Sequence, residues 1–264
     1  MQISGATRVF AILADPIEQV MTPRVINDLF AQQGFNGVMV PVHVAPENLS
    51  SVVLALRTIQ NLDGFVVTVP HKTAMLLLCD ELTTGAKEIG AVNVVHRTVE
   101  NRLIGAMFDG EAFVKGLRAG GVELAGKAIY LCGAGGAASA IAFALSAAGV
   151  SEITIANRTT HHAAQLVQRL LLSNPEIQIR VGNTDPSGHD VVINATSVGM
   201  KESDPLPLNG DKLRENQVVA EIIMLPAETR LLSFAKSLGC KVHYGAPMLD
   251  AQIQLMADFM MGKG

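Results

Sequence analysis

Residues 128–158 constrain the fold more than any other part of the chain. The apolar run Ala128–Cys132 is followed directly by the glycine-rich stretch Gly133–Ala137, and then by small residues that are typical of a tightly packed helix. The stretch 153–156 is typical of a second strand, which ends at Asn157-Arg158. A strand, a tight turn, a helix and a second strand in this order indicate one βαβ unit of a parallel sheet.

The glycine-rich turn fits a dinucleotide site. Gly133 permits the tight turn, Gly135 lets the backbone approach a pyrophosphate, and a small residue at Ala140 allows close helix packing. The helix amino terminus then faces the phosphate charge. We predict coenzyme contacts from Gly133, Ala134, Gly135, Gly136 and Ala137. One alternative is a glycine turn without a ligand. Another is membrane insertion of the uncharged stretch 128–150, against which its glycines and alanines argue.

The end of the second strand distinguishes between the two nicotinamide coenzymes. NAD sites usually place Asp or Glu here to bind the ribose 2′-hydroxyl, whereas a 2′-phosphate requires an arginine in place of the acid. This chain has Asn157, Arg158 and Thr159. These residues favour NADP over NAD, and the alternative for Arg158 is an ordinary solvated charge.

Composition limits the class of protein and its partners. A chain of 264 residues, 49% hydrophobic and 17% charged, suits a well-buried globular protein with one large or two modest domains. The net charge of −4 gives no reason to expect nucleic acid or an anionic membrane as partner. Residues 1–10 show no secretory signal, so we expect a cytoplasmic protein. Cys79, Cys132 and Cys240 have no metal-ligand spacing, and no metal is expected.

Strand and helix patterns alternate along both halves of the chain. A helix is expected with Thr22 as its N-cap and Pro23 as its first residue. The expected strands of the first half are 8–14, 38–44, 64–69, 91–97 and 103–108, the last two pairing as an antiparallel hairpin at the sheet edge. Those that follow the glycine unit are 177–181, 190–195, 218–223 and 241–244.

These patterns predict an α/β fold with two domains. Residues 1–104 would form an N-terminal, mainly parallel βαβ substrate domain, completed by the C-terminal helix 246–264. Residues 105–245 would form a Rossmann dinucleotide-binding domain. A substrate would then bind in the cleft between the two domains.

Two charged residues follow apolar strands of the first half. Lys72 comes shortly after one strand and Asp109 directly after another, at the strand ends where open α/β sheets bind ligands. Oxidation of an alcohol by a nicotinamide coenzyme needs such a group to take the hydroxyl proton. A lysine and an aspartate held together would titrate as one coupled unit. Taken singly, Lys72 also fits a surface cation and Asp109 a helix N-cap.

The chain resembles the shikimate dehydrogenases over nearly its whole length. The matching blocks are Val67-Thr68-Val69-Pro70-His71-Lys72, Gly90-Ala91-Val92-Asn93, Asp109-Gly110, Gly133–Ala137, Asn157-Arg158-Thr159 and Asn194-Ala195-Thr196-Ser197-Val198-Gly199-Met200. The resemblance implies NADP-dependent, reversible reduction of a cyclic ketone, as from 3-dehydroshikimate to shikimate in aromatic amino acid biosynthesis. A monomer or homodimer would be usual for the family.

The resemblance also implies a role for individual residues. Lys72 would transfer the proton and Asp109 would be its partner. The substrate would be bound by Thr22, Thr68, Asn93 and Gln252. Ala195 and Thr196 would join the coenzyme site, and Gly245 would lie against the nicotinamide.

Several positions depart from the family pattern, mostly from polar to apolar. Val20 stands where the family has a serine for the substrate carboxylate, and Met107 and Phe108 replace the polar pair before the acid. Val66 and Met224 replace an asparagine and a tyrosine, and His162 stands at the second basic position for the 2′-phosphate. We therefore expect a related cyclic, more apolar hydroxy compound as the better substrate. The alternatives are a metabolite sensor with weakened catalysis and a quinate-type NAD enzyme, which Asn157 disfavours.

Overall fold

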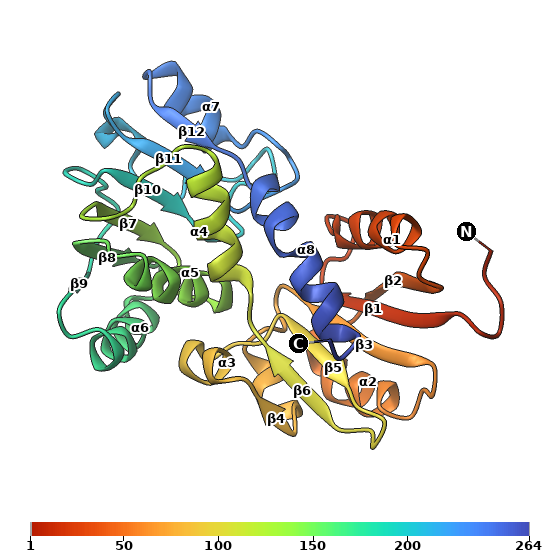
Figure 1. Ribbon diagram of the computed structural model, residues 1–264. Coiled ribbons are helices and arrows are strands. Elements are labelled where there is room, and N and C mark those ends of the chain that lie inside the picture. The colour runs from red at the N-terminus through yellow and green to blue at the C-terminus, as the bar shows by residue number, and fades with distance from the viewer. Residues whose placement is uncertain (1, 264) are drawn as a thin grey trace. The chain divides into compact units, whose positions relative to one another are not determined.

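The chain folds into two compact units, seen in a computed structural model that describes residues 2–263 (Figure 1). Unit 1 comprises the chain up to Phe108 and from Gln252 onward, and unit 2 comprises Asp109–Ala251. Each unit contains a six-stranded sheet with helices packed against it, so the predicted α/β fold with two domains is confirmed. The predicted domain boundaries lay a few residues earlier, at 104–105 and 245–246.

Unit 1 alternates strands and helices along most of its length. Its elements are β1 (Arg8–Ala14), α1 (Thr22–Gln32), β2 (Gly37–His43), the 3-10 helix η1 (Pro46–Asn48), α2 (Leu49–Leu56), β3 (Leu62–Val67), the 3-10 helix η2 (Ala74–Leu78), β4 (Glu81–Leu82), α3 (Thr84–Ile89), β5 (Val94–Arg97) and β6 (Leu103–Ala106). The end of the last helix, α8 (Ala246–Met260), also belongs to it.

The unit 1 sheet is mixed, with the strand order β2-β1-β3-β5-β6-β4. β1 pairs in parallel with β2 and β3, whereas β5 is antiparallel to both β3 and β6. The predicted hairpin of β5 and β6 is therefore present, but it does not lie at the edge. The edge strand next to this hairpin is β4, which pairs with β6 and, with only two residues, is too short to produce an alternating pattern.

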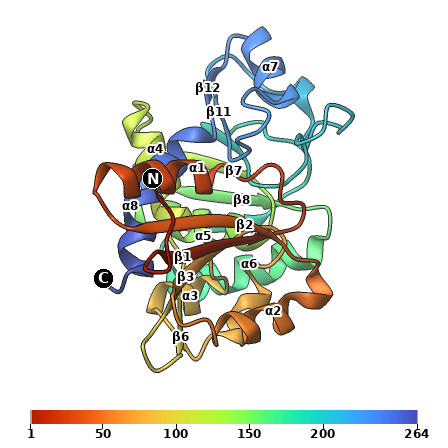
Figure 2. The ribbon, with the colours of Figure 1, turned by 90° about the vertical axis from the view of Figure 1, so that its right-hand side faces the viewer.

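One face of the unit 1 sheet carries a hydrophobic cluster beneath α1 and α8. Phe10, Phe30 and Met256, from β1, α1 and α8, are all at most 2% exposed within it. Figures 1 and 2 show α1 and α2 on opposite faces of the sheet. α1 begins at Thr22, with Met21 in the N-cap position. The prediction of Thr22 as N-cap was therefore wrong by one residue.

Unit 2 begins with a helix and then repeats strand and helix. Its elements are α4 (Asp109–Ala119), β7 (Ala128–Cys132), α5 (Gly136–Ala147), β8 (Glu152–Ala156), α6 (Thr160–Ser173), β9 (Gln178–Val181), β10 (Val191–Asn194), the 3-10 helix η3 (Gly210–Lys212), β11 (Val218–Glu221), α7 (Arg230–Ser237), β12 (Lys241–His243) and the start of α8. The stretch 128–150, weighed above as a membrane segment, forms β7 and α5. Within residues 2–263, no helix has both the length and the apolar character needed to cross a membrane.

The unit 2 sheet is parallel throughout, in the order β12-β11-β10-β7-β8-β9. Successive residues of β7 face opposite sides. Ile129 and Leu131 pack with α4, α5 and α6, whereas Tyr130 packs with α7. Because both faces are covered, β7 is apolar throughout and β10 and β11 are apolar up to their last residues, which explains the continuous hydrophobic runs in the sequence.

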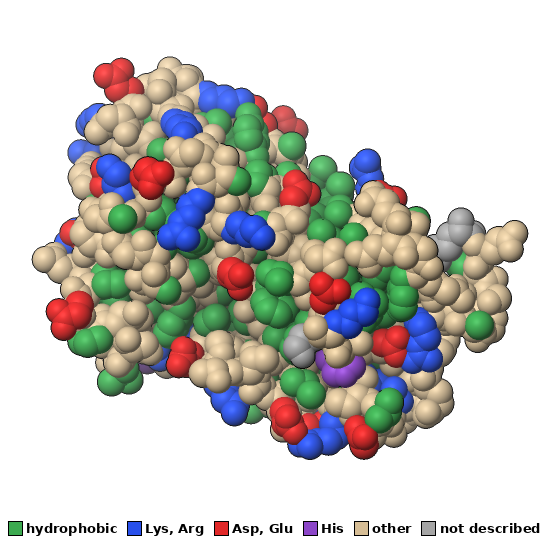
Figure 3. Space-filling view, in the orientation of Figure 1, with side chains coloured by type: hydrophobic (Ala, Val, Ile, Leu, Met, Phe, Trp, Pro, Cys, Tyr) green, Lys and Arg blue, Asp and Glu red, His purple; other side chains and the backbone are tan. Residues whose placement is uncertain are grey.

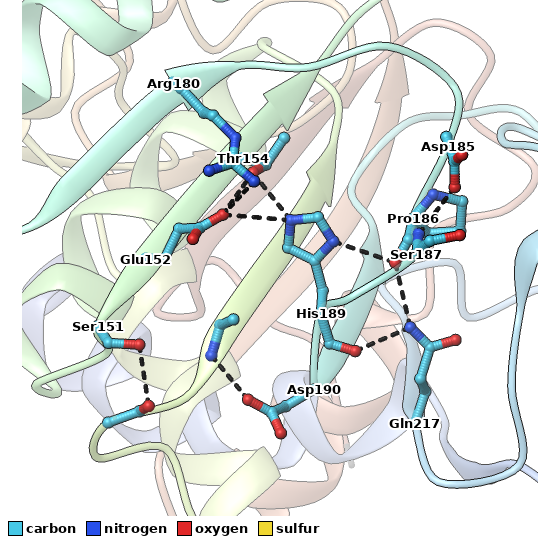
Figure 4. A network of polar contacts seen from close by, with 12 residues as sticks. Ser151, Glu152, Thr154, Arg180, Asp185, Pro186, Ser187, His189, Asp190 and Gln217 are labelled. Atoms are coloured by element: carbon cyan, nitrogen blue, oxygen red, sulfur yellow. Dashed lines mark hydrogen bonds and ion pairs between the residues drawn. The ribbon is translucent and has the colours of Figure 1, made fainter.

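A polar network fixes the amino-terminal edge of this sheet (Figure 4). Buried His189 is 3.0 Å from the Pro186 carbonyl through Nδ1 and 2.8 Å from the Thr154 hydroxyl through Nε2. Asp190 accepts a 2.9 Å hydrogen bond from the backbone of Ala128, the first residue of β7. In a parallel sheet the carboxyl ends of the strands all lie on the opposite side, and open α/β sheets bind their ligands on that side.

Acidic and basic side chains are interspersed over the face of the molecule shown in Figure 3. This distribution agrees with the small net charge of −4. A mixed surface of this kind supports solubility without concentrating a field of one sign.

Candidate active site

Three backbone segments of unit 1 meet where β1 and β3 end and β5 begins. The loop after β3 is tied to β1, because the Thr68 N–H donates to the Leu13 carbonyl at 3.0 Å. The Val92 N–H donates to the Lys72 carbonyl at 2.9 Å, which joins the same loop to the start of β5. Thr68 and Lys72 are both partly exposed. Both residues therefore lie in the loop that follows the carboxyl end of β3, and their roles stay predictions.

Asn93 makes hydrogen bonds to several neighbouring segments at this end of the sheet. Its side chain is 1% exposed, its Oδ1 accepts from the Phe108 N–H at 3.0 Å, and its Nδ2 lies 3.4 Å from the Gln252 Oε1. Its own N–H donates to the Ala106 carbonyl at 2.9 Å. Asn93 thus connects β6 and α8, and the structure brings together Thr68, Lys72, Asn93 and Gln252 within unit 1.

The remaining predicted substrate and catalytic residues lie at element starts. Thr22 is 9% exposed at the first position of α1. Asp109 is 2% exposed at the start of α4, in unit 2. It follows directly after Phe108, the residue whose N–H Asn93 holds. The role of Asp109 as partner of Lys72 stays a prediction.

The glycine turn of unit 2 has the geometry that a pyrophosphate requires. Gly133 has φ +121°, and a Cβ there would lie 2.8 Å from the Ala195 carbonyl oxygen, so only glycine fits. A Cβ on Gly135 would meet no atom within 4 Å, which leaves the backbone open to a ligand. α5 begins at Gly136, so its amino terminus carries the partial positive charge that favours an anion.

Ala140 also lies close to a second helix. A Cβ on Gly110 of α4 would lie 2.0 Å from the Ala140 carbonyl oxygen. The small residues therefore permit close packing of two helices, α4 on α5, in addition to covering the sheet.

The rim after β8 presents the polar side chains predicted for a 2′-phosphate. Asn157 donates to the Thr159 carbonyl at 2.9 Å, which closes the turn before α6. Arg158, Thr159 and His162 are exposed. A guanidinium, hydroxyls and the start of a 14-residue helix together form a suitable environment for a phosphate dianion.

The other residues predicted to contact the coenzyme lie in the loops after β10 and β12. The Ala195 N–H donates to the Cys132 carbonyl at 2.8 Å, which joins this loop to the strand before the glycine turn. The Thr196 hydroxyl donates to the Asn194 Oδ1 at 2.7 Å. A Cβ on Gly245 would lie 2.4 Å from the Ile223 carbonyl oxygen, so the backbone after β11 packs directly against it.

The sequence analysis missed Glu221, the last residue of β11. Its carboxyl is buried, and burial raises its pKa to about 7 although four hydrogen-bond donors surround it. An acidic residue that ends an otherwise apolar strand was the available signal. Among the described residues, no group of three or more His, Cys, Asp or Glu side chains could hold a metal ion.

The departures from the family pattern fall into two groups. Val66 and Met107 are only 2% and 8% exposed, so both belong to the core rather than to an open pocket. Val20, Phe108 and Met224 are partly exposed. Phe108 makes an edge-to-face contact with Phe259 at 5.7 Å between ring centroids. Among the apolar departures in unit 1, Val20 and Phe108 are thus the ones that remain partly exposed while packing against the core.

Comparison with known proteins matches both parts of the chain. The family described as "Shikimate dehydrogenase substrate binding domain" matches residues 12–95, and "Shikimate / quinate 5-dehydrogenase" matches residues 117–200. A shikimate dehydrogenase (NADP(+)) of Rubrobacter xylanophilus is 37% identical over 252 residues, which cover 94% of this chain and 88% of that protein.

Two solved structures show the same fold. Shikimate dehydrogenase from Aquifex aeolicus aligns with a TM-score of 0.89 and 32% identity, covering 99% of this chain and 95% of the other. The ligand-free 5-ketofructose reductase of Gluconobacter sp. strain CHM43 aligns with a TM-score of 0.82 and 30% identity, covering 97% and 93%. Similarity of this extent covers both units of the chain.

Proposed function

This chain belongs to the shikimate dehydrogenase family, and we propose that it reversibly reduces a cyclic ketone to an alcohol, with NADPH as the hydride donor. The pair 3-dehydroshikimate and shikimate, or a related cyclic pair, is the proposed substrate and product. The observation that carries this proposal is the hydrogen-bonded edge around Asn93, which gathers Thr68, Lys72 and Gln252.

In the proposed reaction, the hydride for the carbonyl carbon would come from the bound coenzyme. The carbon–oxygen π bond breaks, and the oxygen takes a proton from the Lys72 ammonium to become a hydroxyl. Asp109 would be the partner of the Lys72 ammonium and would accept a hydrogen bond from the hydroxyl of the alcohol. Because alkoxide charge develops only during the reaction, Lys72 should contribute mainly to kcat. Thr22, Thr68, Asn93 and Gln252 would orient the ring hydroxyls.

A substrate panel tests this function. Consumption of NADPH is followed with 3-dehydroshikimate, with ketones of related cyclic hydroxy acids, and with neutral keto sugars. The last class is included because one relative is named a 5-ketofructose reductase. Turnover of at least one cyclic ketone is expected. No turnover with any of them, together with unaltered NADPH binding in Lys72→Ala, would instead support a metabolite sensor. A cytoplasmic location remains part of the proposal.

Arg158→Ala should change the choice of coenzyme. The guanidinium would make charge-assisted hydrogen bonds to the 2′-phosphate, worth about 1.5–3 kcal/mol, or about 10- to 150-fold in Kd. We expect the Kd for NADPH to rise by this factor while the Kd for NADH stays unchanged, both measured by nicotinamide emission. Arg24→Ala, an exposed arginine on α1, is the matched control. Equal losses for both coenzymes, or tighter binding of NADH than NADPH to the unmodified protein, would contradict the NADP assignment.

Val20→Ser should improve turnover of shikimate. A substrate carboxylate left without a donor beside Val20 costs about 1–3 kcal/mol, so a restored hydroxyl should raise kcat/KM on the order of tenfold. Val25→Ser makes the same change at another partly buried position nearby, on α1, and should have no such effect. An unchanged or lower kcat/KM for Val20→Ser, measured by NADPH formation, counts against the role assigned to this position.

A further inference from the structure

Four donors surround the buried carboxyl of Glu221. Its Oε1 accepts from the backbone N–H groups of Ile222 and Ile223 at 2.9 and 3.1 Å. Its Oε2 accepts from the Asn194 Nδ2 at 3.0 Å and the Thr229 hydroxyl at 3.1 Å. Four donors fill the lone-pair positions of both oxygens, which is the arrangement of an ionised carboxylate. A proton on either oxygen would displace one of these donors.

Asn194 connects the Glu221 carboxylate to the loop after β10. While its Nδ2 is held by Glu221 and by the Val198 carbonyl, its Oδ1 accepts from both the N–H and the hydroxyl of Thr196. The backbone of the same loop lies against the glycine turn, because a Cβ on Gly133 would be 2.8 Å from the Ala195 carbonyl oxygen. The conformation of Thr196 therefore depends on the Asn194 amide and, through it, on Glu221.

The backbone N–H groups of Ile222 and Ile223 connect the Glu221 carboxylate to Gly245, which lies two residues after β12. Ile222 and Ile223 form the turn after β11, and a Cβ on Gly245 would lie 2.4 Å from the Ile223 carbonyl oxygen. The Thr229 hydroxyl also accepts from the Leu232 N–H at 3.3 Å and caps α7. One carboxylate thus connects the loops that follow β10, β11 and β12.

The strand order says which half of the coenzyme these loops meet. A dinucleotide lies across the point where the order of an open parallel sheet reverses. Here that point lies between β7 and β10, with the glycine turn and Arg158 on the side of β7 and β8. The loops after β10, β11 and β12 form the other side, where the nicotinamide half would lie.

Building on the proposed function, we propose that Glu221 is a positioning residue for the nicotinamide half of the coenzyme. Its carboxylate holds the loop of Thr196 and the turn against Gly245 in the conformation that receives the ring. Glu221 itself touches neither coenzyme nor substrate.

The charge of Glu221 should depend on pH near neutrality. Burial raises its pKa to about 7, against the opposing effect of the donors. On β7, burial and the Glu221 charge raise the pKa of Cys132 to about 11, so this thiol stays neutral. The ring of His243 on β12 packs against Phe113 on the other side of the sheet, and burial lowers its pKa. Asp204 accepts from the Gly199 N–H, and this bond lowers its pKa. Of these titratable groups, Glu221 is therefore the carboxyl whose charge changes near pH 7.

Coenzyme affinity and fold stability should respond to this titration in opposite directions. Below about pH 7 the carboxyl gains a proton, a donor is displaced, and the affinity for NADPH should fall. The pKa is raised in the folded state, so the stability contribution of this group is fully present below the unfolded pKa of about 4.5 and is lost as the pH rises through about 7. As the pH rises from about 4.5 to about 7, the Tm advantage of the unmodified protein over Glu221→Gln should accordingly shrink.

The test compares NADPH with 2′,5′-ADP, a fragment that lacks the nicotinamide. Glu221→Gln should raise the Kd for NADPH on the order of tenfold, because the Gln amide presents donors to donors, and should leave the Kd for 2′,5′-ADP unchanged. Glu221→Asp, which keeps the charge, should restore part of the affinity. The matched control Glu228→Gln removes a carboxyl from the exposed surface and should change neither Kd.

Two outcomes would overturn the inference while the coenzyme site stands: equal losses for NADPH and 2′,5′-ADP, or no loss for either. Absence of binding of both ligands to the unmodified protein would instead contradict the proposed function. If Glu221→Gln does not fold, the unmodified protein is titrated with NADH, which lacks the titrating 2′-phosphate. A fall in NADH affinity below about pH 7 supports the role of Glu221, and a flat profile between pH 6 and 8 overturns it.

Discussion

Replacement of Lys72 by Met should lower kcat by about 10²- to 10⁴-fold, the range that a positioned proton-transfer group contributes. The KM for NADPH should change little, because Lys72 lies in unit 1 and the proposed coenzyme residues lie in unit 2. The ketone would still bind, but its oxygen would receive no proton as the hydride arrives. Steady-state rates with saturating NADPH measure this effect.

Lys87→Met provides the matched control for Lys72. Lys87 is an exposed lysine in the last turn of α3, also in unit 1, and its replacement should leave kcat unchanged. A kcat in Lys72→Met equal to that of the control, under conditions where chemistry limits the rate, would remove Lys72 from the catalytic group.

Replacement of Gly135 by Ala should separate coenzyme binding from stability. The φ of −82° at this position suits alanine, and the added methyl group meets no protein atom within 4 Å. The free energy of unfolding should change by less than about 1 kcal/mol, because the loss of a glycine N-cap and the reduced entropy of the unfolded chain oppose one another. The same methyl group would occupy the space of the pyrophosphate. We expect a loss of about 1–3 kcal/mol of binding, or about 5- to 150-fold in the Kd for NADPH.

The control for Gly135 is Gly85→Ala on α3, where the new methyl group also meets no atom within 4 Å. Neither NADPH binding nor turnover should change in this variant. If Gly135→Ala binds NADPH as tightly as Gly85→Ala does, then the open backbone at Gly135 is not where the coenzyme lies.

The parts of the fold that the sequence predicted correctly are those with long, regular patterns. The continuous apolar strands of unit 2 and the glycine turn gave the Rossmann arrangement, because a strand buried on both faces leaves no polar alternation. β4 escaped prediction because a strand of two residues has no period. The N-cap of α1 was misplaced because Thr-Pro resembles a helix start, whereas the helix begins at Thr22 itself.

Strand ends alone indicated Lys72 and Asp109 as candidate site residues, whereas Asn93 was indicated only by the family resemblance. Glu221 was not recognised because its meaning depends on Asn194 and Thr229, which lie 27 residues before it and 8 residues after it. Single-sequence patterns do not contain such contacts. Burial is a second feature that the sequence left open. Val66 stands where the family has an asparagine, and the structure shows it 2% exposed within the hydrophobic cluster of unit 1.

A double-mutant cycle on Lys72 and Asp109 tests the central claim most directly, since the proposal is that the Lys72 ammonium and the Asp109 carboxylate act as one catalytic group. We measure kcat for Lys72→Met, Asp109→Asn and the double variant, after confirming by nicotinamide emission that each still binds NADPH. Residues that act as a unit show strongly non-additive effects, so the double variant should be no slower than the slower single variant. Two losses that multiply in the double variant would contradict the claim, because they would show that Lys72 and Asp109 act independently.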